Sequence, residues 1–277
     1  MIRVYRTISR RSPDFHRRPL IPLLALALSL SGCVGARRSD APGPGGGPLV
    51  GAVAREAGPR RDPLGEVGGE LFTAAPDRST YVPYGGEFAD PTVASHHVTR
   101  VGLDAVRSGP GRWRESRASC AGGNSTPVAD QILERAADGS VALVETIEHD
   151  DGVVTEFAPP MVLLPAALRA ATPFRQSLRM TVRPLEDRGR VRMEGPATQE
   201  IVFEGTQRVR LGAAGFDASV IRMTLTADLG SVKVRTVTRA WLAPALGSVL
   251  EQADETASML GIPVRTKAKH WALLQPP

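Results

Sequence analysis

The sequence contains few of the residues that cross-link small exported domains or build metal sites. Only two of its 277 residues are cysteine, Cys33 and Cys120. A framework of several disulfides and a C-x-x-C metal or redox site are therefore excluded. If Cys33 is modified, Cys120 has no partner within the chain, and we expect it to be a small buried apolar residue.

The sequence also lacks a hydrophobic run long enough to cross a bilayer as a helix. The apolar segment Pro19–Leu30 has about a dozen residues, whereas a spanning helix needs about 20. Six arginines and only one aspartate accompany it within residues 1–32. A basic start, a short apolar stretch and small residues before a cleavage point are typical of a secretory signal peptide.

The leader ends in Leu30-Ser31-Gly32-Cys33, which resembles the lipobox of bacterial lipoproteins. The resemblance implies cleavage before Cys33 and attachment of acyl chains such as palmitate to that cysteine, which would anchor the protein to a membrane. Each buried CH₂ group contributes about 0.8 kcal/mol to such anchoring. Val34 follows in place of aspartate, which favours the outer membrane with the domain facing the periplasm. The alternative is an uncleaved anchor, or an ordinary signal peptide with a chance cysteine.

Net charge is almost absent once the leader is removed. The whole chain has 34 basic and 29 acidic side chains and a net charge of +5. Since residues 1–32 hold six basic and one acidic side chain, 28 of each remain. No basic motif with interleaved aromatic residues is present, so we exclude nucleic acid as a partner.

Composition divides the mature chain into three parts. Residues 33–70 include Pro42–Pro48, a run of only proline and glycine, and are expected to be a disordered tether. Residues 71–110 have no clear periodicity and are expected to be poorly ordered. Residues 111–277 alternate between apolar and polar side chains and are expected to form one β-rich domain.

The alternating segments predict an all-β domain with minor α content. Asp138-Gly139 and Asp151-Gly152 separate alternating runs, a pattern typical of hairpins whose turns need positive φ. Pro165–Ala171 is rich in helix formers and begins with proline, which predicts one short helix capping the sheet. We therefore expect a curved antiparallel meander or half-barrel.

A second resemblance comes from "RAWLAPALGSVLEQ", Arg239–Gln252. Proline and glycine predict a strand ending near Trp241, a tight turn and a second strand. The stretch is similar to a W-x-A-P-G-x-G-x-V turn of β-rich envelope lipoproteins of unknown function, whose folds resemble the LolA/LolB lipoprotein-carrier half-barrel. This chain has Ala245 where that pattern usually has glycine. The resemblance implies a fold and no activity.

No constellation for catalysis, metal binding or a cofactor is evident. The histidines outside the leader, His96, His97, His149 and His270, do not form an H-E-x-x-H motif, and no G-x-S-x-G is present. Glu200 and Glu204 on one strand would lie about 13 Å apart, too far for a glycosidase pair. We expect no catalytic residues, no metal and no cofactor.

Two function classes remain in competition, with an enzyme assembled only in three dimensions as a third. The first is a non-catalytic scaffold, adaptor or sensor with an envelope protein partner. The second is a lipid or lipoprotein carrier with an apolar groove in the curved sheet. The groove candidates, which otherwise are simply core, are Met161, Val162, Leu163, Leu164, Leu168, Met180, Phe203, Met223 and Leu225.

Charge is unevenly distributed along the mature chain. Residues 33–173 have a net charge of −5 and residues 174–240 a net charge of +5. The acidic set Glu145, Glu148, Asp150, Asp151 and Glu156 is expected to pair with the later basic strands across a sheet face. The functional alternative is a basic patch for phospholipid headgroups or another anionic partner.

Overall fold

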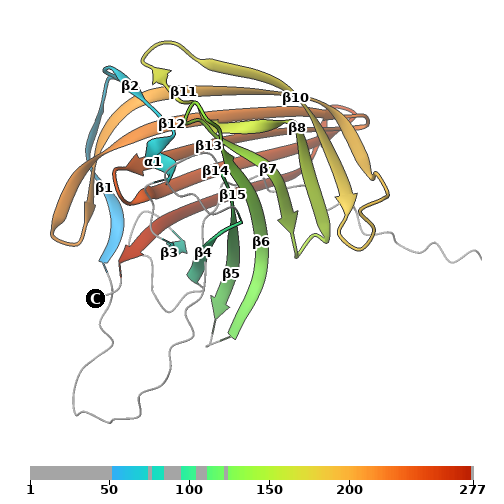
Figure 1. Ribbon diagram of the computed structural model, residues 1–277, viewed down its shortest axis with the longest axis horizontal. Coiled ribbons are helices and arrows are strands. Elements are labelled where there is room, and N and C mark those ends of the chain that lie inside the picture. Colours follow the sequence, from blue (N-terminus) through green and yellow to red (C-terminus); the bar gives the residue numbers. More distant parts are fainter. Residues whose placement is uncertain (1–51, 74–76, 84–94, 104–110, 122–123, 276–277) are drawn as a thin grey trace, which may run out of the picture.

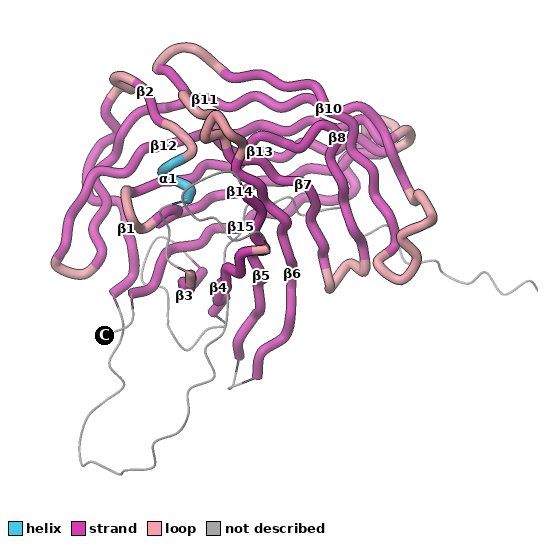
Figure 2. Tube along the Cα trace, in the orientation of Figure 1, coloured by secondary structure: helices cyan, strands magenta, loops and turns pink. Residues whose placement is uncertain are grey.

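The computed structural model describes residues 52–73, 77–83, 95–103, 111–121 and 124–275. The leader, Cys33 and the run Pro42–Pro48 lie outside these residues. Strand accounts for nearly all of the described chain (Figure 2), and its one helix, α1 (Glu70–Thr73), has four residues. Within the described residues, no helix is long and apolar enough to cross a membrane.

Fifteen strands make up the rest of the fold (Figure 1). They are β1 (Ala52–Arg61), β2 (Glu66–Val67), β3 (Arg78–Pro83), β4 (Ser95–Gly102), β5 (Gly111–Ala121), β6 (Asn124–Arg135), β7 (Val141–Glu148), β8 (Val153–Leu164), β9 (Leu168–Arg169), β10 (Phe174–Pro184), β11 (Met193–Leu211), β12 (Ala214–Leu229), β13 (Val232–Ala243), β14 (Gly247–Met259) and β15 (Ile262–Gln275).

The main sheet closes on itself, so the expected half-barrel is wrong and the meander is a closed antiparallel barrel. Its order is β11-β10-β8-β7-β6-β5-β4-β3-β15-β14-β13-β12, and β12 pairs back onto β11 from Ala197↔Ala227 to Leu211↔Ala214. The strands that complete this ring are β3 and β4. They lie in the segment 71–110 that the sequence predicts to be poorly ordered.

Strand β1 adds a second closure at one end of the barrel. It pairs with the last third of β11, beyond the part that β10 occupies, and its first residues pair with the end of β15. Figure 1 shows β1 beside the ends of these strands. The described fold therefore includes Ala52–Arg61, which lies inside the segment 33–70 that the sequence assigns to a tether.

The closed sheet contains two apolar cores. The larger one is built from inward side chains of β6–β8 and β10–β13, including Leu133, Met161 and Ile201. The smaller one lies where β1 joins, around Val209, Trp241 and Leu250. Because inward positions alternate with outward ones along each strand, β11 reads as a regular succession of buried and exposed side chains.

Two local expectations can be compared with the structure. The hairpins at Asp138-Gly139 and Asp151-Gly152 are confirmed, with φ of 92° at Gly139 and 61° at Gly152. The predicted helix Pro165–Ala171 is wrong. That segment contains β9, which pairs with β2 in a two-stranded sheet, so a partner from the N-terminal region overrides the local helix propensity.

The turn within Arg239–Gln252 is confirmed. Strand β13 ends at Ala243, strand β14 begins at Gly247, and Trp241 is buried next to the turn. The Trp241 indole donates a hydrogen bond to Gln207 Oε1 at 2.7 Å, and the Gln207 amide donates to Glu56 at 2.8 Å and to the Gly58 carbonyl at 2.9 Å. These bonds connect β13 through β11 to β1.

Candidate functional site

Charged side chains gather inside the closed sheet, together with the apolar side chains of the core. We call this set the interior charged cluster. Each of its members stands at an inward position of its strand, and all but Lys269 are at most 5% exposed. The members are Glu115 and Arg117 on β5, Glu148 on β7, Glu251 and Glu255 on β14, and Lys269 on β15.

Two walls of the barrel contribute these groups. On one wall, Glu115, Gln131, Thr146 and Thr155 are aligned across β5 to β8. On the other wall, Thr236 of β13 faces its neighbour Glu255 of β14. The same strands therefore carry polar and apolar side chains into the interior.

The titration of the cluster reflects burial among opposing charges. Burial raises the pKa of Glu251 to about 8 and that of Glu148 to about 7, while Arg117 and Lys269 act in the opposite direction on both. Burial lowers the pKa of Arg117 and of Lys269, against the attraction of the surrounding carboxylates. The carboxyl groups of Glu148 and Glu251 thus titrate near neutral pH.

Several buried oxygen atoms on these walls have no hydrogen-bond partner among the described residues. They include the hydroxyls of Thr146, Thr155 and Thr236 and Oε1 of Glu251. A buried polar group without a partner costs about 1–3 kcal/mol, so ordered water is the natural partner for these atoms. Among the described residues, no group of three or more histidine, cysteine or acidic side chains could hold a metal ion.

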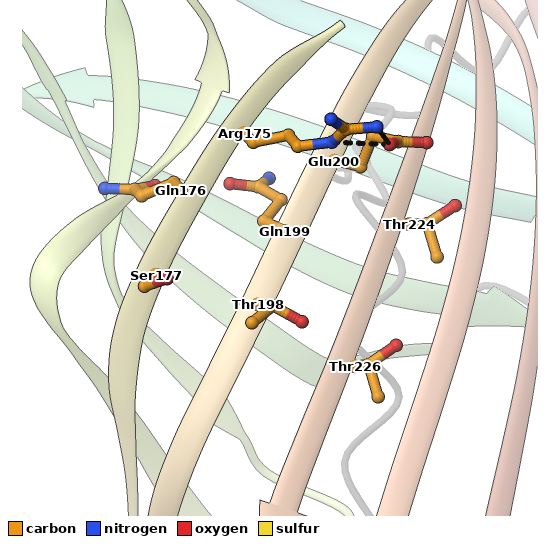
Figure 3. Close-up of a pocket in the computed structure, with 8 residues that line it drawn as sticks. All are labelled: Arg175, Gln176, Ser177, Thr198, Gln199, Glu200, Thr224 and Thr226. Atoms are coloured by element: carbon orange, nitrogen blue, oxygen red, sulfur yellow. Dashed lines mark hydrogen bonds and ion pairs between the residues drawn. The ribbon is translucent and has the colours of Figure 1, made fainter.

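A pocket of about 390 Å³ lies outside the barrel, over β10, β11 and β12 (Figure 3). Its lining is polar and consists of Arg175, Gln176, Ser177, Thr198, Gln199, Glu200, Thr224 and Thr226. Arg175 and Glu200 form an ion pair at 2.8 Å along one side. The amides of Gln176 and Gln199 bind the backbone of β8 at Pro160 and Val162, which ties β8 to its neighbours. The lining offers hydrogen bonds and one ion pair.

The expected pairing of the acidic set with the basic segment 174–240 is confirmed for two of the named acids. Glu156 pairs with Arg183 at 3.0 Å and Glu145 with Arg188 at 3.1 Å. Asp151 lies 3.8 Å from Arg265, which is outside that segment. Glu148 does not join them, because it faces the interior beside Arg117.

Glu200 and Glu204, which the sequence excludes as a glycosidase pair, are engaged with arginines. Glu204 accepts hydrogen bonds from Arg60, Arg222 and Arg239. Burial acts to raise its pKa, but the bonds from Arg239 and Arg222 prevail and hold that pKa below its usual value. Both glutamates therefore serve as cross-strand ion-pair centres.

The groove candidates lie together in one packed region. Eight of the nine are at most 6% exposed and belong to the larger apolar core. They are Met161, Leu163, Leu164, Leu168, Met180, Phe203, Met223 and Leu225, and Val162 is partly buried against them. This arrangement is that of a packed core, and a bound lipid would have to displace these side chains.

The single residues noted in the sequence are dispersed. His149 sits in the β7–β8 hairpin and lies 3.2 Å from Asp130. His270 is exposed on β15. Cys120, on β5 opposite Ser125, is only partly buried, whereas the sequence predicts a buried residue. Cys33, the lipidation candidate, lies outside the described residues.

Sequence reasoning did not find the interior charged cluster. A signal was present in the alternation of Glu251, Ala253 and Glu255 along β14, which puts two acids and a small residue on one face. Nothing local to that strand indicates whether this face is inward. The answer depends on Arg117 and Lys269, which only the closed fold brings near.

Comparisons with known proteins leave the chain without an assigned family. No family model and no curated protein matches it. A candidate lipoprotein from Parabacteroides distasonis aligns with 10% identity and a TM-score of 0.43, over 74% of this chain and 98% of that structure. A candidate exported protein with a YmcC-like fold from Bacteroides fragilis aligns with 10% identity and a TM-score of 0.39, over 82% and 98%. At these values neither structure assigns a function to this chain.

Proposed function

We propose that this chain is a lipoprotein of the bacterial envelope, held at the outer membrane by acyl chains on Cys33, with its domain facing the periplasm. In this proposal the domain is a non-catalytic adaptor, scaffold or sensor that works through its outer surface. The support for the location is the basic start, the short apolar segment and the Leu30–Cys33 sequence.

The observation that carries the non-catalytic role is the closed and filled interior. The interior charged cluster is enclosed by the barrel, with Glu115, Arg117, Glu148 and Glu251 only 3–5% exposed. A substrate would have to open the sheet to reach them. The outer wall is what remains accessible to a partner.

The anchoring is tested by the intact mass and membrane fractionation of the full chain. We expect the unmodified protein to have lost residues 1–32, to carry acyl chains and to fractionate with membranes, whereas Cys33→Ser should lose all three properties. Cys120→Ser is the matched control and should keep them. An unprocessed mass, or a Cys33 recovered in a disulfide and not in a thioether, would overturn the proposal.

The adaptor role is tested by photo-crosslinking in whole cells. A photo-reactive side chain placed at Thr198 on the outer wall should yield one reproducible envelope adduct. The same side chain at Ala213, in the exposed turn between β11 and β12, should not yield that adduct. Identical adducts from both positions, or only abundant bystanders, would argue against a specific partner on this face.

The second candidate function is lipid or lipoprotein carriage. The observation in its favour is that the groove candidates share one interior region. Protein purified from native membranes would then retain acyl chains that are not bonded to Cys33, and mass spectrometry of an organic extract would detect them. A protein that yields no such chains and does not bind fluorescent fatty acids would exclude this function.

A further inference from the structure

Six outward side chains are aligned across the outer wall of the barrel, one on each strand from β10 to β15. All six are exposed, and five carry a hydroxyl group. We call this set the hydroxyl row, and in strand order it is Ser177, Thr198, Thr226, Arg235, Thr256 and Thr266. Since neighbouring strands lie about 4.8 Å apart, the row extends over about 24 Å.

One end of the row is hollowed. Ser177, Thr198 and Thr226 line the outer pocket (Figure 3). Arg175 and Glu200 lie directly opposite each other two residues along the same strands, and their ion pair borders the hydroxyls. The pocket therefore combines neutral hydroxyls with a guanidinium donor and a carboxylate acceptor.

The hydroxyls of the row are available to an outside molecule. Within the described residues, no side-chain hydrogen bond involves any of the five, although the neighbouring outward residue Thr224 accepts one from Arg222. Each hydroxyl can donate one hydrogen bond and accept two. Threonine is also common on solvated strands, so the residue types alone do not identify a ligand.

The chemistry and the spacing of the row indicate the class of ligand. It contains no aliphatic or aromatic side chain that would favour an acyl chain or an apolar helix, and its single arginine offers little attraction to a polyanion. Neutral hydroxyls repeated at a constant interval match a ligand that presents hydroxyls at intervals along an extended chain. We propose that the hydroxyl row binds a linear glycan strand that lies across β10–β15, with one sugar in the pocket. This inference deepens the proposed adaptor role and depends on it for the location of the ligand.

The test uses the full-length protein in detergent and linear oligosaccharides of two to eight sugars, both neutral and uronic, as probes in calorimetric titrations. Affinity should increase with chain length and stop increasing once the ligand spans the row. Removing two hydroxyls with Thr198→Val and Thr226→Val together should weaken binding about tenfold, because each hydrogen bond contributes about 0.5–1.5 kcal/mol. The two changes preserve side-chain shape and strand propensity, and the urea midpoint verifies folding.

Thr181→Val is the matched control, since Thr181 is an outward residue of β10 outside the row and should leave affinity unchanged. Absence of length-dependent binding across the probes, or equal affinity in the double variant, would overturn the inference. The Cys33→Ser chain separates the two proposals. Glycan binding that persists without the acyl chains supports the row independently of the anchor, and anchoring without glycan binding refutes the row alone.

Discussion

At the scale of single residues, the turn between β13 and β14 holds an alanine where the backbone favours glycine. Ala245 has a φ of 62°, and a left-handed conformation costs a non-glycine residue about 1–2 kcal/mol. Glycine has no Cβ and adopts this φ without that cost. We expect Ala245→Gly to raise the free energy of unfolding by about 1 kcal/mol in urea titrations, since the relieved strain exceeds the added chain entropy.

Ala137→Gly provides the control for this change. Ala137 is exposed in the turn between β6 and β7 and is not among the residues with positive φ. Glycine there should lower the free energy of unfolding by about 0.5 kcal/mol, because only the entropy of the unfolded chain changes. A loss of stability in both variants would show that Ala245 is not strained.

At the scale of elements, the attachment of β1 depends on a close backbone approach at the bulge of β11. A Cβ atom at Gly205 would lie 2.0 Å from the carbonyl oxygen of Arg61, and the φ of Gly205 is 127°. Gly205→Ala should therefore lower the free energy of unfolding by about 3 kcal/mol, from overpacking and backbone strain together. It should also displace β1, so that trypsin cleaves after Arg60 and Arg61 in the folded protein.

The comparison variant for this prediction is Gly230→Ala. Gly230 also has a positive φ, 80°, but no atom lies within 4 Å of its added Cβ. It should cost only the backbone term, about 1–2 kcal/mol, and leave β1 resistant to trypsin. If the two variants lose the same stability and β1 remains protected in both, then contact with Arg61 does not limit this position.

Elements whose signal is local could be predicted from the sequence. The strands that flank Asp138-Gly139 and Asp151-Gly152 follow from alternation and from the turn residues, and the turn after Trp241 follows from proline and glycine. The segment Pro165–Ala171 shows the limit of local signals. Its helix formers are outweighed by pairing of β9 with β2, about 100 residues earlier in the chain.

Closure of the sheet could not be predicted, because the strands that complete it carry weak signals. Strand β1 contains Gly58 and Pro59 and is interrupted by a bulge between Glu56 and Arg60, so it reads as a linker. Strands β3 and β4 lie between proline- and glycine-rich stretches. Once the ring is assumed open, the inward acids of β14 look like one face of a solvated strand, and the interior charged cluster is missed.

At the scale of the whole molecule, closure buries charged side chains, and two of the buried carboxyl groups titrate near neutral pH. Arg117 on one wall is coupled to Glu251 on the opposite wall, and Glu148 is coupled to Lys269. An open sheet would expose these groups and leave their pKa values near those of free side chains. The pH dependence of stability is therefore a measure of whether the barrel is closed.

The sign of that dependence follows from the direction of the pKa shifts. Folding raises the pKa of Glu148 to about 7 and that of Glu251 to about 8, from 4.5, mainly through burial. Both carboxyl groups bind their protons more tightly in the folded state than in the unfolded state. The associated stability is complete below pH 4.5 and is lost as the pH rises through 7 and 8.

We expect the free energy of unfolding to decrease between pH 6 and pH 9 by on the order of 3 kcal/mol, measured by urea titration at constant ionic strength. Glu251→Gln replaces the protonated carboxyl by a neutral side chain of the same shape and should remove much of this decrease. Glu194→Gln, an exposed change at the Arg179 ion pair, should leave it intact. A stability that is constant or increases over this pH range would mean that the two carboxyl groups are solvated, which is incompatible with a sealed interior.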